Sequence, residues 1–468
     1  MILAVAGAIT VAAAGLAVPA AASTVGVYGF GNNTFGELGN GTTAASSLPV
    51  AALGLPGTVR QVAAGYGTSA ALLADGTVWT WGNNVNGQLG YSTTAGYVTT
   101  PQKVPGLSGI TQIVMAWPGD GYALGSDGTV WAWGDNSDGQ LGNGGTTSAI
   151  VPARVPGLNQ VTQVAAANGH VLVRRSDGTV AAWGENNNGE LGDGTTLNRL
   201  TPVQVQVLTG ITEIATGSAS YAVRSDGTLF SWGANFNGLL GNGSTGGYVT
   251  TPAPLSLSGV TQLATNDDST LAVVRSTGRV FAWGSNACGQ LGDGTTVAKS
   301  APELIGLASV SQVAVSSTIL EDSSAAIRSD GSLWTWGCNY SGQLDNGTSS
   351  AGTPTPTAVA NLTGVSQFVI GDEIPAGGLF DSAAYGLAIG SPVQVAVPRV
   401  IGDTTGQASQ ALLAVGLTLG TVSTRVDSTC NNIGKVLSQS PAAGTMVQLG
   451  SAVSVTIGQR PAPPHVCP

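Results

Sequence analysis

Carboxylates are the side chains of this sequence whose type and spacing come nearest to general acid–base chemistry. Asp193 and Asp293 recur in the phrase Asp-Gly-Thr-Thr, but three other copies carry an amide at the same position, Asn40, Asn143 and Asn242. Interchange of Asp with Asn indicates that the position caps a turn rather than transfers protons. Calcium binding is the alternative for such oxygen-rich loops, but the sequence has no D-x-D-x-D-G run, so we predict no metal site.

Histidine is too scarce to support a conventional catalytic site. The chain has two His residues, and His465 lies near the C-terminus. His170 lies at a repeated position, where a single His is typical of a structural role and no nucleophile-elbow motif accompanies it. We therefore predict a protein that is not an enzyme, with no catalytic residues and no cofactor. The residues that other copies carry at the position of His170 are Thr68, Asp120, Ala219, Thr270 and Ser323.

A ten-residue block that recurs seven times must position any functional loops. Successive blocks begin 49 to 53 residues apart with an aromatic residue and follow the pattern W-G-x-N-x-x-G-x-L-G. Its Gly and Asn residues fit a compact loop with left-handed positions, and its Leu is predicted to fill the space between neighbouring units. The first copy begins with Phe30, and the other six begin with Trp residues that we assign to the structural core: Trp81, Trp133, Trp183, Trp232, Trp283 and Trp336.

The segments around each block predict short β-strands. In one period, residues 59–65 and 69–74 have the composition of strands, and the Trp lies on a further strand at 77–82. Asp-Gly pairs such as Asp75-Gly76 predict tight hairpin turns. Units of this kind cannot bury their faces alone and must stack, so a period of ~50 residues indicates the blades of a propeller.

The combined motif G-V-x-Q-V-A…S-D-G-T-V-W-x-W-G-x-N-x-x-G-Q-L-G resembles the repeat of the regulator-of-chromosome-condensation family. The resemblance covers about residues 24–391 and implies a mainly β fold, a seven-bladed β-propeller. The first copy lacks its early strands, and the last copy lacks its Trp strand. We therefore expect the N-terminal strand to complete the last blade and close the ring, and we assign residues 23–391 to the propeller.

Aromatic residues in the variable loops are the candidates for partner binding. Trp117 stands where other copies have Ala or Gly, which indicates an exposed contact residue rather than a repeated core position. Tyr97 and Tyr248 both belong to the phrase Gly-Tyr-Val-Thr-Thr-Pro, so we expect their loops to share one rim. Local packing of large loops is the alternative for each. The full set of rim candidates is Tyr66, Tyr97, Trp117, Phe236, Tyr248 and Tyr340.

From residue 397 a different order of elements begins. Apolar residues at helical spacing end at Gly416, and alternating strands follow. This βαββ order resembles a PASTA domain over residues 397–458, on Val397-Pro398, Gly402 and Gln439-Ser440-Pro441 among other matches. The resemblance implies a small α+β module of the bacterial cell envelope, often associated with peptidoglycan. We assign residues 392–396 to a linker and 459–468 to a Pro-rich tail.

The four Cys residues predict disulfides rather than zinc, because no C-x-x-C pair is present. Cys288 and Cys338 fall in the same type of loop in adjacent blades, where a disulfide requires Cα atoms closer than ~7 Å. Cys430 precedes a predicted strand and Cys467 lies in the tail, so we predict a Cys430–Cys467 disulfide that holds the tail; free thiols are the alternative for each pair.

The N-terminus and the net charge restrict location and partners. Residues 1–22 are apolar and end in Ala20-Ala21-Ala22, which predicts a signal peptide and a secreted or cell-envelope location in a bacterium; a retained membrane anchor is the alternative. The net charge of −10 and the absence of a basic cluster exclude a typical nucleic-acid-binding protein.

Together these patterns favour a secreted or cell-envelope scaffold, expected to be a monomer, that binds an unidentified protein partner through propeller rim loops. The C-terminal module would contact peptidoglycan. The family resemblance implies two alternatives: guanine-nucleotide exchange, as in the founding member, and inhibition of a secreted enzyme, as in the β-lactamase-inhibitory propeller. A lyase or glycosidase built on the propeller is a third class, disfavoured by the scarce His residues and the Asp/Asn interchange.

Overall fold

The computed structural model describes residues 25–93, 95–274, 277–316, 322–373 and 383–462. The predicted signal peptide at residues 1–22 lies outside these ranges, as do His465 and Cys467. The chain divides into two compact units, one spanning Val25–Val393 and a C-terminal unit that begins at Gln394. Within the described ranges, no helix is long and apolar enough to cross a membrane.

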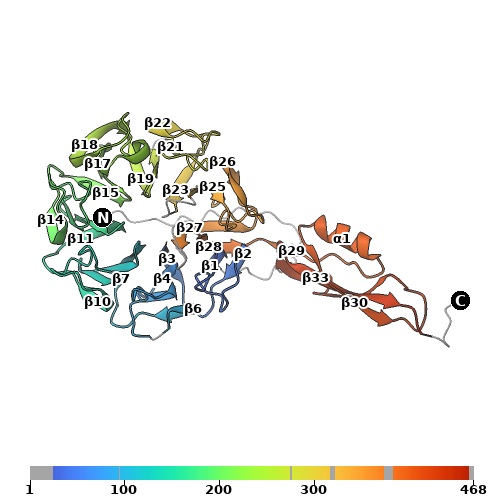
Figure 1. The fold of residues 1–468 in the computed structure, drawn as a ribbon. Coiled ribbons are helices and arrows are strands. Elements are labelled where there is room, and N and C mark those ends of the chain that lie inside the picture. Colours follow the sequence, from blue (N-terminus) through green and yellow to red (C-terminus); the bar gives the residue numbers. More distant parts are fainter. Residues whose placement is uncertain (1–24, 94, 275–276, 317–321, 374–382, 463–468) are drawn as a thin grey trace, which may run out of the picture. The chain divides into compact units, whose positions relative to one another are not determined.

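The first unit consists of seven four-stranded antiparallel sheets, the blades of a propeller (Figure 1). This confirms the predicted seven-bladed fold. From the innermost to the outermost strand the blades are: blade 1, β3 (Val59–Gly65), β4 (Thr68–Leu73), β5 (Val78–Asn83) and β6 (Tyr97–Lys103); blade 2, β7 (Ile110–Ala116), β8 (Asp120–Gly125), β9 (Val130–Gly134) and β10 (Ala149–Arg154); blade 3, β11 (Val161–Ala167), β12 (His170–Arg175), β13 (Val180–Gly184) and β14 (Arg199–Gln204); blade 4, β15 (Ile211–Thr216), β16 (Ala219–Arg224), β17 (Thr228–Ala234) and β18 (Tyr248–Ser258); blade 5, β19 (Val260–Thr265), β20 (Ser269–Val274), β21 (Arg279–Gly284) and β22 (Lys299–Leu304); blade 6, β23 (Val310–Val315), β24 (Ser323–Arg328), β25 (Leu333–Asn339) and β26 (Ser350–Ala358); blade 7, β27 (Leu362–Glu373), β28 (Ala383–Pro392), β1 (Gly26–Gly31) and β2 (Ser46–Ala51).

Blade 7 is built from both ends of the propeller sequence. Strand β1 pairs antiparallel with β28, from Gly26 opposite Gly390 to Gly31 opposite Tyr385. The N-terminal strand therefore completes the last blade, as the two partial repeats predict. Closure in this way covers the edge of β28 that would otherwise be free.

The repeated Trp residues hold adjacent blades together. All six are fully buried, and each indole donates a hydrogen bond to a main-chain carbonyl in the ten-residue block of the preceding blade. Trp81 Nε1 donates to Glu37 O at 2.6 Å, and Trp183 Nε1 donates to Gln140 O at 2.8 Å. A buried Trp needs such a partner for its N–H group. Each block thus supplies the acceptor for the next blade.

Local contacts also explain why the ten-residue block carries Asn and Gly. In blade 3, Asn186 Oδ1 accepts a hydrogen bond from the Leu191 main-chain N–H at 2.9 Å, and equivalent bonds recur in the other blocks. Gly189 has a φ of 81°, and a Cβ there would lie 2.7 Å from Thr250 Cα on the next blade. Glycine is required at this position by both its backbone conformation and the close approach of the neighbouring strand.

A pair of hydrogen bonds also joins neighbouring innermost strands. Gln61 on β3 donates through Nε2 to Ile113 O at 2.8 Å and accepts from Ile113 N at 2.9 Å on β7. Gln367 on β27 bonds Val62 in the same way and closes the circle. Blade 4 departs from the pattern, because Glu213 occupies the repeated Gln position.

The C-terminal unit packs one helix against a small sheet. Its elements are β29 (Gln394–Ala396), α1 (Thr405–Leu413), β30 (Thr418–Val426), β31 (Val436–Ser440), β32 (Met446–Gln448) and β33 (Ala452–Gln459). Strand β33 pairs with β30 in parallel and with β31 antiparallel. Thr404 and Gln407 form a capping box that begins α1, and Gly416 takes a positive φ just beyond its end. Residues 392–396, assigned to a linker from the sequence, contain the end of β28 and all of β29.

Candidate interaction rim

Strand direction divides the propeller loops into two sets. Because the strands of each blade are antiparallel, the loops from first to second strand and from third to fourth strand emerge at one end. We call this end the long-loop rim. The hairpin turns from second to third strand and the connections between blades emerge at the other end, which we call the turn rim.

The structure places all six aromatic candidates on the long-loop rim. Tyr97, Phe236, Tyr248 and Tyr340 have 46–54% of their surface exposed. Tyr66 and Trp117 are partly buried. They belong to neighbouring loops, since the Tyr66 ring lies 3.2 Å from where a Cβ of Gly119 would be. The candidates therefore share a rim but do not form one cluster, because they come from blades 1, 2, 4 and 6.

Two of the exposed rings have local packing partners. Tyr97 lies 6.2 Å from Phe35, a residue of the block in blade 7. Phe236 begins a short 3₁₀ turn, Phe236–Gly238, and lines a hollow of about 600 Å³ between blades 4 and 5. A related hollow of about 320 Å³ lies between blades 1 and 2 beside Val85 and Ile150. Hollows of this kind form where a block meets the outer strand of the next blade.

Carboxylates that were not among the sequence-predicted candidates also gather on the long-loop rim. Burial, opposed by a hydrogen bond from Asn237, raises the pKa of Asp268. Burial, together with Asp268 and Asp267, raises the pKa of Asp322 well above its usual value. Asp322 accepts hydrogen bonds from Asn266 Nδ2 and Gln290 Nε2, both at 2.9 Å. The signal in the sequence was the run Asn266-Asp267-Asp268, where blade 1 has Gly65-Tyr66-Gly67 and blade 3 has Ala167-Asn168-Gly169.

His170, the candidate His of the propeller, is buried beneath this rim among hydrogen-bond partners of the next blade. His170 is 1% exposed, and its Nε2 lies 3.1 Å from Ser220 Oγ, which itself donates to Glu190 O at 2.7 Å. Burial lowers the pKa of His170 to about 4, so the ring is neutral at pH 7. The arrangement fits a structural role. Strand pairing places Ser269, and not Thr270, at the equivalent position in blade 5.

The turn rim is built from self-contained turns. Asp127 Oδ1 accepts from the Thr129 hydroxyl at 2.6 Å and from its main-chain N–H at 3.1 Å. These bonds lower the pKa of the exposed Asp127, and Asp177 repeats them with Thr179. Arginines on this rim cover aromatic rings, as Arg154 does over Trp131 at 5.0 Å. Asp127, Asp177 and Arg154 on this rim thus have partners within their own blade.

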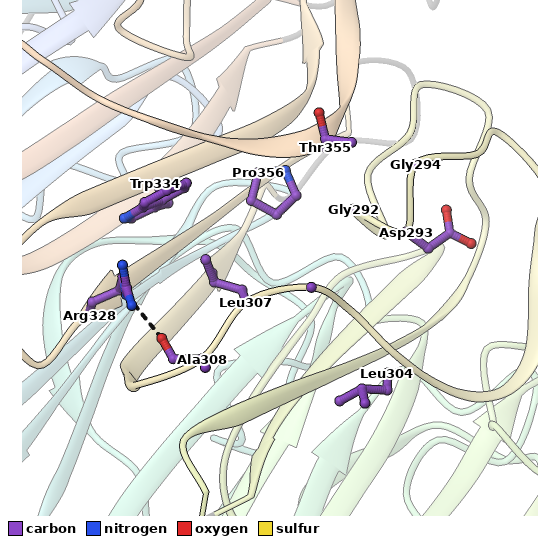
Figure 2. Close-up of a pocket in the computed structure, with 11 residues that line it drawn as sticks. Gly292, Asp293, Gly294, Leu304, Leu307, Ala308, Arg328, Trp334, Thr355 and Pro356 are labelled. Carbon is purple, nitrogen blue, oxygen red and sulfur yellow. Dashed lines mark hydrogen bonds between the residues drawn. The ribbon is translucent and has the colours of Figure 1, made fainter.

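A groove of about 460 Å³ lies between blades 5 and 6 (Figure 2). Arg328 covers Trp334 at 5.5 Å and donates from Nε to Ala308 O at 3.0 Å. Asp293 lies at the far end of the groove from Arg328 and pairs with Lys299 at 3.4 Å. Both charged groups that line the groove therefore have intramolecular partners. The remaining lining residues are Gly292, Gly294, Leu304, Gly306, Leu307, Thr355 and Pro356.

A disulfide links the same two blades, blades 5 and 6. Cys288 and Cys338 form a disulfide between the blocks of blades 5 and 6, with Cα atoms 5.1 Å apart. Cys430 is also disulfide-bonded, and its predicted partner Cys467 lies outside the described residues. Among the described residues, no group of three or more His, Cys, Asp or Glu side chains is arranged to hold a metal ion.

Each of the two units matches a known protein family. Residues 26–376 match the RCC1-like domain, and residues 395–459 match the PASTA domain. The chain is 34% identical over 150 residues to the ultraviolet-B receptor UVR8 of Arabidopsis thaliana, covering 31% of this chain and 34% of the receptor. It is 37% identical over 137 residues to the mouse E3 ubiquitin-protein ligase HERC2, covering 28% of this chain and 3% of the ligase. The chain thus spans about a third or less of the curated relatives named here.

Solved structures share the propeller fold. Prp20p from Saccharomyces cerevisiae, described with its binding to Gsp1p and histones, superposes with a TM-score of 0.69 at 23% identity, over 80% of this chain and 93% of Prp20p. Human WBSCR16 superposes with a TM-score of 0.67 at 24% identity, over 78% of this chain and 99% of that protein. At this level of identity the similarity establishes the fold alone.

Proposed function

The chain belongs to the RCC1-like domain family, and on that premise we propose that its propeller is a protein-binding scaffold whose long-loop rim holds the partner. Support comes from one contrast between the rims. The long-loop rim presents half-exposed aromatic rings together with Asp267 and Asp268, whose charges help to raise the pKa of the buried Asp322, whereas turn-rim aspartates such as Asp127 and Asp226 have partners within their own blade. Exposed aromatic side chains beside charged groups are typical of surfaces that bind proteins.

The second unit supports a location outside the cytoplasm. It matches the PASTA domain, and the described chain contains disulfide-bonded Cys residues in both units. Disulfides persist mainly in oxidising compartments. We therefore propose a secreted or cell-envelope protein whose C-terminal unit contacts peptidoglycan while the propeller binds a protein. Sedimentation of the purified full-length chain with peptidoglycan sacculi tests the proposed contact with peptidoglycan.

A matched pair of substitutions tests the role of the long-loop rim. Full-length wild-type chain, Phe236→Ala and Val207→Ala are each used to capture proteins from cell-envelope and culture-medium extracts. Val207 is exposed on the turn rim, so its truncation removes apolar surface from the opposite end. We expect a specific protein to be retained by wild type and Val207→Ala and reduced about fivefold with Phe236→Ala, as for a central aromatic contact.

Equal retention by all three chains would contradict a role for this rim, and failure of every chain to retain a protein would contradict the scaffold itself. If the retained protein is an enzyme whose activity falls on binding, the scaffold acts as an inhibitor.

A further inference from the structure

Strand β30 forms an open edge of the three-stranded sheet in the C-terminal unit (Figure 1). The sheet has the order β30–β33–β31, so β30 pairs with β33 and, within the described part of the chain, with no other strand. Its nine residues include seven that are exposed. Along such an edge, alternate main-chain N–H and C=O groups point away from the sheet and can bond a further strand.

The apolar face of the sheet continues onto this edge. Val422 pairs in register with Val455 of β33, and side chains of paired residues share one face of a sheet. The next residue of β30 on that face, Thr424, pairs with Ile457. Both β33 residues are buried in the core of the unit, whereas Val422 is 45% exposed and Val426 is 55% exposed. The face that is covered over β33 is therefore open to solvent at β30.

The composition of β30 suits it to pair with a copy of itself. Residues 421–426 are rich in β-branched side chains, contain neither Pro nor Gly, and carry one charge, on Arg425. Edge strands of natural proteins are usually protected by Lys, Pro or a bulge. The irregularity in the β30–β33 pairing lies between Leu419 and Val422, and residues 422–426 pair regularly. This run therefore presents a regular edge with little protection against a further strand.

Two copies of β30 are complementary when they run antiparallel about a two-fold axis at Thr424. This register places Val422 of each copy opposite Val426 of the other, so that the exposed apolar side chains meet. It also places Arg425 opposite Ser423. Moving the axis one residue toward the C-terminus would set Arg425 against its own counterpart, and moving it one residue toward the N-terminus would set Val422 against Thr424.

We propose that a second copy of this chain pairs through β30, which joins the two C-terminal sheets into one and gives a dimer in place of the expected monomer. The C-terminal tail of the chain is a poor occupant of the edge, because Pro461, Pro463 and Pro464 lack the N–H groups that a strand ladder needs. A dimer carries two propellers, so a partner with two binding sites is held more tightly than by one propeller.

Sedimentation equilibrium of the full-length chain measures the association, at concentrations up to about 0.1 mM because small interfaces are typically weak. We expect a monomer–dimer equilibrium for wild type. Val422→Lys puts a charge on the pairing edge and should raise the dimer dissociation constant about tenfold. Met446→Lys puts the same charge on an exposed apolar residue of β32, in a separate sheet, and should leave the constant unchanged.

Cysteine cross-linking tests the register. Thr424→Cys places two thiols at the proposed axis, where directly opposite Cα atoms are about 5 Å apart, within the ~7 Å limit for a disulfide. Thr421→Cys is the matched control on the same strand, because each Thr421 would lie about 20 Å from its counterpart. Under mild oxidation we expect a disulfide-linked dimer from Thr424→Cys and none from Thr421→Cys on a non-reducing gel.

A wild-type chain that stays monomeric at every concentration would overturn the proposal. So would a dimer that Val422→Lys and Met446→Lys weaken equally, or cross-linking of Thr421→Cys as efficient as that of Thr424→Cys. Circular dichroism checks that the variants fold, and sedimentation of the wild-type chain gives a result that needs no variant.

Discussion

The two rims use the same residue, aspartate, in opposite ways. On the turn rim, Asp127 is exposed and its pKa is lowered by hydrogen bonds from Thr129. On the long-loop rim, Asp120 is buried, one of its oxygens has no partner, and burial raises its pKa to about 8. The turn-rim Asp recurs because its carboxylate caps the hairpin, as Asp127 does with Thr129. The long-loop Asp120 departs from the repeat, and its burial costs stability.

The largest expected effect is a change of folding stability with pH that depends on Asp120. Asp120 holds a proton in the folded chain up to about pH 8 but releases it near pH 4 when unfolded. Folding stability should therefore fall as pH rises from 4 to 8. Asp120→Ser, which restores the hydroxyl found at Ser323, should gain about 3 kcal/mol over wild type at pH 9 and little at pH 4. Urea unfolding across this range measures the difference.

The matched turn-rim variant, Asp127→Asn, should behave in the opposite sense. The lowered pKa of Asp127 means that its contribution is present above about pH 4 and is lost as pH falls through the folded pKa. Wild type should be slightly more stable at pH 7, and the two chains should converge once the pH is below the folded pKa of Asp127. If the free energies of unfolding of Asp120→Ser and Asp127→Asn, each relative to wild type, changed with pH in the same direction, the electrostatic difference between the rims would be contradicted.

Two glycine substitutions compare how tightly the two rims are packed. Gly128 in a turn-rim hairpin has a φ of 77°, and a Cβ there would lie 3.1 Å from Gln160 Cα. Gly246 on the long-loop rim has the same φ of 77° with nothing within 4 Å. Gly128→Ala should cost about 2–3 kcal/mol and Gly246→Ala about 1 kcal/mol, because only the first adds crowding to backbone strain. Thermal unfolding of both variants gives the comparison, and equal losses would show that the turn rim is no more tightly packed.

The smallest effect concerns the innermost strands. Burial raises the pKa of Glu213 to about 7, opposed by Gln163 and Arg174. In the folded chain Glu213 stays protonated at pH values where it ionises in the unfolded chain. The folded chain therefore loses stability as pH rises from about 4.5 to 7. Glu213→Gln restores the repeated residue and should stabilise the chain by about 1 kcal/mol at pH 8, discounted for partial exposure. The gain should vanish near pH 4, and a gain that persists there would indicate packing rather than charge.

Much of the fold was predictable because each repeat specifies its structure locally. The spacing of Trp81, Trp133 and the later Trp residues, with Asp-Gly turns between alternating strands, is sufficient to predict blades. The truncated first and last copies also predicted that β1 would close the ring. The acceptor of each indole could not be predicted, because Glu37 O reaches Trp81 only when two blades stack.

The sequence by itself determined the number of blades, their strands and the two-unit organisation, since hydrophobic alternation and turn residues act over short distances. Only the tertiary structure decided which carboxylates gather on the long-loop rim and which loops meet there. Asn168 and Asp267 are 99 residues apart, and no local pattern relates them. They meet because the ring brings the equivalent loops of blades 3 and 5 to one rim, where residues that break the repeat can act together.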